Sequence, residues 1–171
     1  MFTSLDAFCD WLANTPFSQL LQNVAWIIPM VQSVHIVCIA IVMGSIALID
    51  LRLLGVTGHS QAISSMTKRL LPWVWWSLLV LLLTGSLLAI AEPVRSLENP
   101  AFQAKMLMVL TAGFLTFYFQ GVVRGEEAFW EMTPARRLTA KMTAIVSLLL
   151  WVGIVFAGRW IAYMDVSYGG G

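Results

Sequence analysis

Charged side chains are scarce in this sequence. Asp, Glu, Lys and Arg make up 11% of the 171 residues, whereas hydrophobic residues make up 59%. Soluble domains typically carry about 25% charged and roughly 45–50% apolar residues. A soluble domain of this size could not bury so much apolar surface, so the composition excludes that class and indicates an integral membrane protein.

Several functional signatures are missing as well. The net charge of +1 gives no reason to expect nucleic acid as a partner. Cys9 and Cys38 lie on different elements and fit no metal-cluster spacing, so we expect no disulfide and no cysteine metal site. Residues 1–15 contain no Lys or Arg and no long apolar segment, so we expect no secretory signal peptide there. The sequence has no recognisable catalytic triad and no glycine-rich phosphate loop.

The hydrophobic residues fall in long blocks, each near the roughly 20 residues that a helix needs to cross a bilayer. The fold predicted from these blocks is all-α, an integral membrane four-helix bundle forming a single domain over residues 1–171. Asn99 and Thr133 stand directly before prolines, a pattern typical of helix starts. The transmembrane helices are expected at about residues 25–54, 61–91, 100–124 and 134–164.

The N-terminal region has a different pattern. Leu5, Phe8 and Leu12 share one helical face, and Thr15 followed by Pro16 indicates a second helix start. This spacing predicts a short amphipathic surface helix over about residues 4–22. Seven of the ten Lys and Arg residues lie near the first and third connections between transmembrane helices. The positive-inside rule then places both termini, and the surface helix, on the periplasmic side.

The first transmembrane helix carries a single histidine, His35. On this helix Ser33, Ala40, Gly44 and Ala47 form a stripe of small residues, which predicts a helix-packing seam. His35 points to nearly the opposite face, where contact with lipid would be costly. We therefore expect that the helix is covered on both faces, or that a second chain or a cofactor covers His35.

Counting equal depths from the outer helix ends predicts which residues reach His35. The level of His35 corresponds to Thr84, to Met108 and Thr111, and to Gly153. Met108 is placed to act as a second axial ligand of a haem iron, because His/Met ligation is an established pair. Thr84 or Thr111 is placed to hydrogen-bond the imidazole instead.

Three cations cluster at the outer rim above this level, where haem propionates would bind: Lys105, Arg159 and Arg95. Three interpretations of His35 stay open at this point: a structural hydrogen bond, a cofactor or metal ligand, and proton or quinone chemistry. His59 is the only other histidine and lies in a connection, too far from His35 to share one iron. At the inner end of the first transmembrane helix, Asp50 and Arg52 are interpreted as an interfacial pair. A buried Asp50 would instead need a cation such as Arg124, or would be neutral.

Three segments carry a resemblance to known proteins: VHIVCIAIVMGSIALIDLRLLG, NPAFQAKMLMVL and LWVGIVFAGRWIAY. Over about residues 25–163 the chain resembles an uncharacterised family of bacterial four-helix membrane proteins, with DLRLLG and GRxIAY as the most specific motifs. More distantly, it is similar to the copper-resistance D proteins and to the HemJ-type membrane protoporphyrinogen oxidase. His35 matches the first histidine of that type and Lys105 its lysine, whereas Gln120 stands where the second histidine is expected.

The resemblance implies a multi-pass protein of the bacterial inner membrane. We expect an accessory or electron-transfer subunit of an inner-membrane redox assembly that binds haem b through His35. The alternative is a purely structural or assembly subunit without a cofactor of its own. The expected partners are the lipid bilayer, bound lipid, and other membrane subunits or a second copy of the chain.

Overall fold

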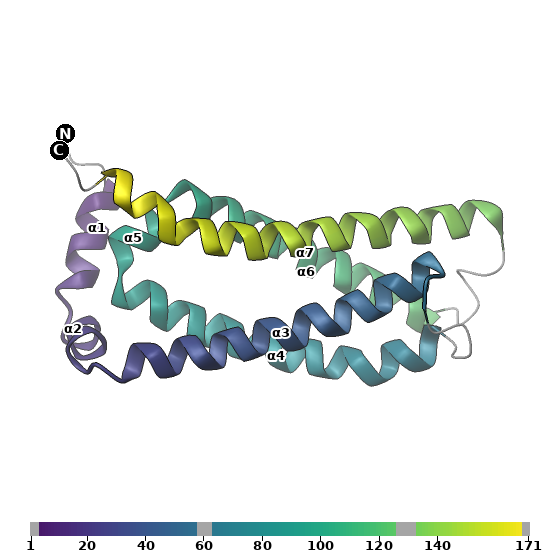
Figure 1. Cartoon of the computed structure of the whole chain (residues 1–171), viewed down its shortest axis with the longest axis horizontal. Helices are drawn as coiled ribbons and strands as arrows, with labels where there is room; N and C mark the ends of the chain where they lie inside the picture. Colours follow the sequence, from purple (N-terminus) through teal and green to yellow (C-terminus); the bar gives the residue numbers. More distant parts are fainter. Residues whose placement is uncertain (1–3, 58–62, 126–132, 169–171) are drawn as a thin grey trace.

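The structure is a computed structural model that describes residues 4–57, 63–125 and 133–168. For residues 63–64, 120–125 and 162–168 it describes the backbone alone. The described residues form helices and no strands (Figure 1). In chain order the helices are α1 (Ser4–Ala13), α2 (Pro16–Asn23), α3 (Ile27–Leu54), α4 (Ile63–Ala91), α5 (Pro93–Leu97), α6 (Pro100–Gly125) and α7 (Pro134–Tyr168).

Four of these helices, α3, α4, α6 and α7, are long and apolar enough to cross a membrane, which confirms the predicted number. They lie along a common axis as two pairs (Figure 1): α3 packs along α4, α6 packs along α7, and α3 also contacts α7. The predicted caps are present, since Asn99 Oδ1 accepts from the Ala101 amide at 2.9 Å and Thr133 Oγ1 accepts from the Arg136 amide at 3.4 Å.

The bundle has two buried apolar clusters. The middle cluster is built around Val42, Ile46 and Trp151, and the inner cluster around Ile49 and Phe119. Only 17–33% of the most apolar 18-residue stretch of each long helix is buried inside the chain. The remaining apolar surface is far larger than an ordinary soluble monomer exposes, as expected for a chain whose long helices face lipid.

The predicted surface helix is two helices rather than one. Thr15 ends α1 and caps α2, because its hydroxyl oxygen accepts from the Ser18 amide at 3.3 Å. Both helices lie across one end of the bundle (Figure 1). Phe8, Trp11 and Phe17 remain half-exposed or more, which leaves apolar side chains available to the membrane interface.

The α2 helix caps the C-terminal end of α4. The last carbonyls of a helix lack partners within it. Here the fully buried hydroxyl of Ser18 donates to the Ile90 carbonyl at 2.7 Å, and the Gln22 amide donates to the Ala91 carbonyl at 2.8 Å. These bonds fix the N-terminal helices to the membrane bundle.

The short helix α5 was not predicted, and it closes the same end. Glu92 and Arg95 form an exposed ion pair at 2.8 Å. Cys9 of α1 is fully buried beside Glu98, directly after α5. Burial, and then the Glu98 carboxylate, raises the pKa of the Cys9 thiol, which keeps it protonated and unreactive. Cys9 and Cys38 are both free.

The small-residue stripe, predicted as a helix-packing seam, packs against no other helix of the single chain in the part that the structure describes. Ser33, Ala40 and Gly44 are exposed, and a Cβ placed on Gly44 would meet no atom within 4 Å. The buried face of α3 is instead the one that carries His35, where Val42 and Ile49 supply larger side chains to the clusters. Larger side chains bury more apolar area, so this face packs on α4 and α7, and α3 is not covered on both faces.

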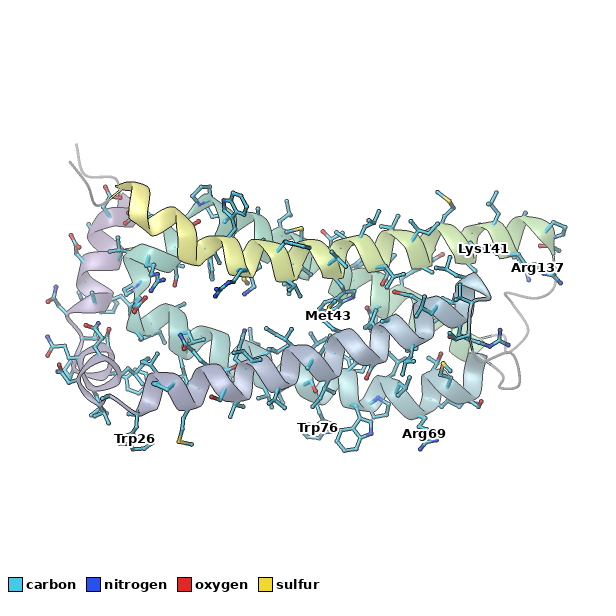
Figure 2. All side chains as sticks on the ribbon, in the orientation of Figure 1. Trp26, Met43, Arg69, Trp76, Arg137 and Lys141 are labelled. Carbon is cyan, nitrogen blue, oxygen red and sulfur yellow. The ribbon has the colours of Figure 1, made fainter. Side chains whose placement is uncertain are left out.

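The basic residues gather at the end of the bundle opposite α1 and α2. Figure 2 shows Arg69, Arg137 and Lys141 at this end and Trp26 at the other. The first residue of α1 and the last turn of α7 lie together at the end that carries Trp26 (Figure 1). This separation of charge is the pattern on which the predicted orientation depends.

Replacing Ser18 with alanine should loosen the N-terminal helices. The change leaves the Ile90 carbonyl without its donor, at a cost of about 1–3 kcal/mol. We expect the thermal unfolding midpoint in detergent to fall and amides of α2 to exchange faster with deuterium. Ser33→Ala is the control, because the Ser33 hydroxyl is exposed and bonds only the Pro29 carbonyl of its own helix. Equal midpoints for the two variants would contradict the capping role.

Candidate functional site

The candidate site lies in the half of the bundle next to α1 and α2, where His35 of α3 meets Thr84 of α4. His35 Nδ1 and Thr84 Oγ1 are 2.7 Å apart. Thr84 is 8% exposed, whereas His35 is half-buried. Gly85 lies beside the ring, and a Cβ placed on it would be 3.5 Å from His35 Cε1. The glycine thus lets α4 present its polar group close to α3.

The direction of this hydrogen bond follows from the single proton on the threonine hydroxyl. Thr84 Oγ1 lies 2.7 Å from the Val80 carbonyl oxygen of its own helix, which accepts that proton. The hydroxyl therefore has only lone pairs to offer His35, so His35 Nδ1 is the donor. A neutral imidazole protonated at Nδ1 carries its lone pair on Nε2. That nitrogen is the one available to a ligand or a metal ion.

Lys105 of α6 supplies a cation next to this imidazole. It is half-buried and lies close enough to His35 for the two side chains to interact electrostatically. Its Nζ packs on α7, 3.5 Å from the Cβ position of Gly158. Among the side chains that the structure describes, no carboxylate pairs with Lys105. An ammonium in this position favours an anionic or strongly polarised group.

Met108 lies one turn below Lys105 on α6. Its Sδ is only 3.1 Å from the Cβ position of Gly153 on α7, so a glycine accommodates this side chain as well. Met108 also packs against the middle cluster beside Val42. His35, Lys105 and Met108 each lie against a glycine of the neighbouring helix, so glycines make room for these side chains within the α3–α4 pair and the α6–α7 pair.

Among the described side chains, no contact with His35 is found for the other residues that the sequence analysis considered for this site. Thr111 is exposed, and its hydroxyl donates to the Leu107 carbonyl of its own helix at 2.8 Å, so it does not bond His35. Arg159 is exposed and has an interaction of its own. His59 and the side chain of Gln120 lie outside the described residues.

The donor set limits what this site could hold. Across residues 4–57, 63–125 and 133–168, no three His, Cys, Asp or Glu side chains converge as metal ligands. The described residues around His35 therefore offer no such set of three ligands to a free transition-metal ion. His35 Nε2 could instead supply one ligand to a metal held in a macrocycle.

A second polar site lies in the half of the bundle away from α1 and α2, and the sequence analysis did not predict it. Asp50 is 4% exposed, so it is a buried side chain rather than one member of an interfacial pair with Arg52. The Ser147 hydroxyl of α7 hydrogen-bonds its carboxylate. Two patterns indicated this contact: Asp50 shares the His35 face of α3, and Thr143 and Ser147 are spaced four apart on α7.

Residues 10–164 match the profile of a family of unknown function, DUF6644. The chain belongs to this family. The match covers most of the chain, including all four long helices and both polar sites. A search of the curated proteins and a search of the solved structures found no match. Nothing in these comparisons links this DUF6644 member to copper-resistance D or HemJ-type proteins, so that part of the resemblance stays a prediction.

The His35–Thr84 contact predicts a difference between two threonine variants. Thr84→Val keeps the shape but removes the acceptor, which leaves a half-buried donor at a cost of about 0.5–1.5 kcal/mol. Thr84→Ser keeps the hydroxyl and should lose less. We expect the valine variant to have the lower thermal unfolding midpoint in detergent. Thr111→Val, which removes a hydroxyl that bonds only its own helix, is the control. A midpoint for Thr84→Val no lower than this control would contradict the contact.

Proposed function

We propose that the chain is an accessory or electron-transfer subunit of a bacterial inner-membrane redox assembly and binds haem b through His35. One observation carries this proposal: the His35–Thr84 hydrogen bond occupies Nδ1 and leaves the Nε2 lone pair free. Histidines that ligate metals commonly donate their other N–H to a protein acceptor, which fixes the ring and raises its basicity.

The neighbouring side chains fit the same group. Haem b carries two propionates, and Lys105 offers an ammonium without a carboxylate partner among the described side chains. Met108 offers a thioether at a similar depth. Bound haem would supply one-electron transfer between redox partners. The chain's own contribution would be to orient the imidazole through Thr84, to compensate negative charge through Lys105, and to exclude water with apolar helices.

The distribution of charge supports the membrane orientation that this function requires. Arg69, Arg137 and Lys141 lie at the end away from α1 and α2 (Figure 2). The positive-inside rule places that end in the cytoplasm and both termini in the periplasm. His35 and Lys105 then lie in the periplasmic half of the membrane.

Haem reconstitution of the purified full-length chain tests the proposal. We expect added haem b to give a Soret band that shifts on reduction and is lost in His35→Ala. Thr84→Val should weaken haem binding about 10–100-fold, as expected for the loss of a hydrogen bond that orients a metal ligand. Thr111→Val is the matched control and should bind like the parent protein, since Thr111 does not bond His35.

Two outcomes would contradict haem binding through His35. A chain that is folded by circular dichroism but gives no Soret band with haem b does not bind it. A band of equal affinity and position in the parent protein and in His35→Ala would assign the haem to another site.

A second candidate function is a purely structural subunit, and one observation favours it. The stripe of Ser33, Ala40 and Gly44 on α3 is exposed in the single chain. Small residues let two helices approach closely inside a membrane. A transmembrane helix of another subunit, or of a second copy, would find room against Gly44, where a Cβ would meet no atom within 4 Å.

Leucine substitutions separate this second function from the first. Gly44→Leu should leave the thermal unfolding midpoint of the purified chain unchanged, because the added side chain meets open space. It should release the partner or the second copy during mild detergent extraction and size-exclusion chromatography. Gly113→Leu on α6 is the control, because Gly113 has open space as well. Identical elution of the parent protein and both variants would contradict a packing role for the stripe.

A further inference from the structure

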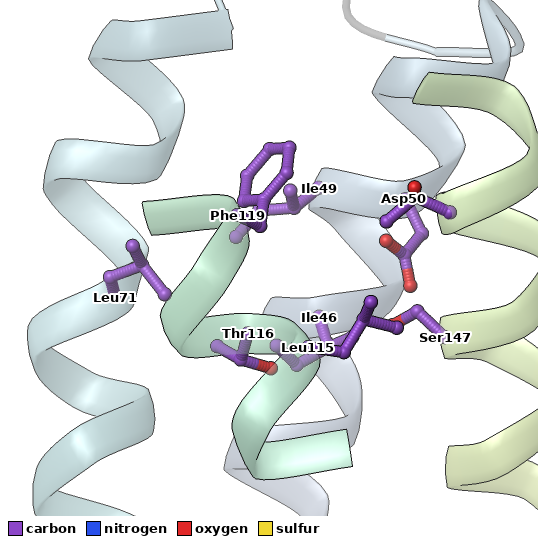
Figure 3. A pocket seen from close by; sticks show the side chains of 9 residues that line it. Ile46, Ile49, Asp50, Leu71, Leu115, Thr116, Phe119 and Ser147 are labelled. Atoms are coloured by element: carbon purple, nitrogen blue, oxygen red, sulfur yellow. The ribbon is translucent and has the colours of Figure 1, made fainter. Parts of the chain in front are cut away.

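The half of the bundle away from α1 and α2 holds a small pocket that the proposed haem site does not use (Figure 3). Apolar side chains form most of its lining: Ile46, Ile49, Leu71, Leu115 and Phe119. Its polar lining comes from three helices: Asp50 of α3, Thr116 of α6, and Thr143 and Ser147 of α7. The cavity volume is about 20 Å³. A volume above about 10–15 Å³ holds one particle the size of a water molecule.

The Asp50 carboxylate is incompletely satisfied in this pocket. The side chain is 4% exposed, and the Ser147 hydroxyl bonds the carboxylate. Its Oδ2 is buried and has no hydrogen-bond partner. Among the described side chains, no Lys or Arg pairs with it. A buried carboxylate anion without a partner is strongly unfavourable, so Asp50 stays protonated unless a cation enters the pocket and compensates its charge.

The surrounding hydroxyls are oriented as acceptors. Thr116 Oγ1 donates its proton to the Ala112 carbonyl at 2.9 Å, and Ser147 Oγ donates to Asp50. Each oxygen therefore keeps lone pairs that can face the pocket. Carboxylate and hydroxyl oxygens are hard ligands, which suit alkali and alkaline-earth ions rather than softer transition metals. A single carboxylate balances one positive charge, which favours a monovalent ion.

We propose that this pocket binds one Na⁺ ion, with Asp50 Oδ2 as the charged ligand and Thr116, Thr143 and Ser147 as neutral oxygen ligands. The ion supplies the missing charge and occupies the unsatisfied carboxylate oxygen. It also joins α3, α6 and α7 at the end of the bundle away from His35. This inference is independent of the haem proposal, because Asp50 lies fifteen residues along α3 from His35, about 22 Å in a helix.

Thermal unfolding of the full chain in detergent, at constant ionic strength, tests the site. Chloride salts of Na⁺ and of the bulky cation N-methyl-D-glucamine are compared. Because an ion that binds only the folded state stabilises it by mass action, the midpoint should rise with Na⁺ by roughly 3–5 °C per tenfold increase above the dissociation constant. N-methyl-D-glucamine, which is too large for the pocket, should give no rise.

Variants assign the response to the pocket. Asp50→Asn keeps the side-chain shape and removes the buried charge, so it should fold but lose the Na⁺ response. Thr143→Val should weaken the response while keeping the carboxylate. Glu92→Gln, which removes a carboxylate of the exposed rim pair, is the control and should keep the full response. A parent midpoint that does not depend on Na⁺, or an equal response in Asp50→Asn, would overturn the proposal.

Discussion

An imidazole in the apolar part of a bilayer requires a polar partner, and Thr84 provides one for His35. The interaction begins in the backbone of α4, where the Val80 carbonyl takes the threonine proton. The hydroxyl oxygen can then only accept, so His35 donates from Nδ1 at 2.7 Å. The free nitrogen of the ring, its contact with Gly85 and its position beside Lys105 all follow from this pairing of α3 with α4.

In the bundle as a whole, the apolar side chains that pack the helices together and the polar side chains that could bind ligands form distinct groups. Large side chains around Val42 and Ile49 hold the helices together in the middle and at the inner end. Polar groups lie in two places: around His35, in the half of the bundle next to α1 and α2, and around Asp50, in the other half. Because the chain buries so little of its own apolar surface, lipid or a partner subunit must complete its environment. Other DUF6644 proteins with polar residues at both of these places would have the same separation of polar groups from apolar packing.

Much of the fold could be predicted from the sequence, because long apolar blocks and proline caps are local features. Counting equal depths limited the possible hydrogen-bond partners of His35 to Thr84 or Thr111, and the structure shows that Thr84 is the partner. The face of α3 that packs within the chain could not be predicted, because this helix is apolar all round. Its small-residue stripe lies on the face that the single chain leaves exposed. The Asp50 pocket was missed because the two patterns that indicated it, the face of α3 that Asp50 shares with His35 and the four-residue spacing on α7, do not tell how α7 crosses α3.

The protonation state of His35 tests the central interaction most directly. Nitrogen-15 NMR of histidine-labelled protein distinguishes the two neutral tautomers, and a His59→Gln variant assigns the signals, because the chain has only two histidines. At a pH where the ring is neutral, we expect His35 to carry its proton on Nδ1 and to have an unprotonated Nε2. A neutral ring protonated on Nε2 would contradict the direction of the hydrogen bond and the free ligand nitrogen that depends on it.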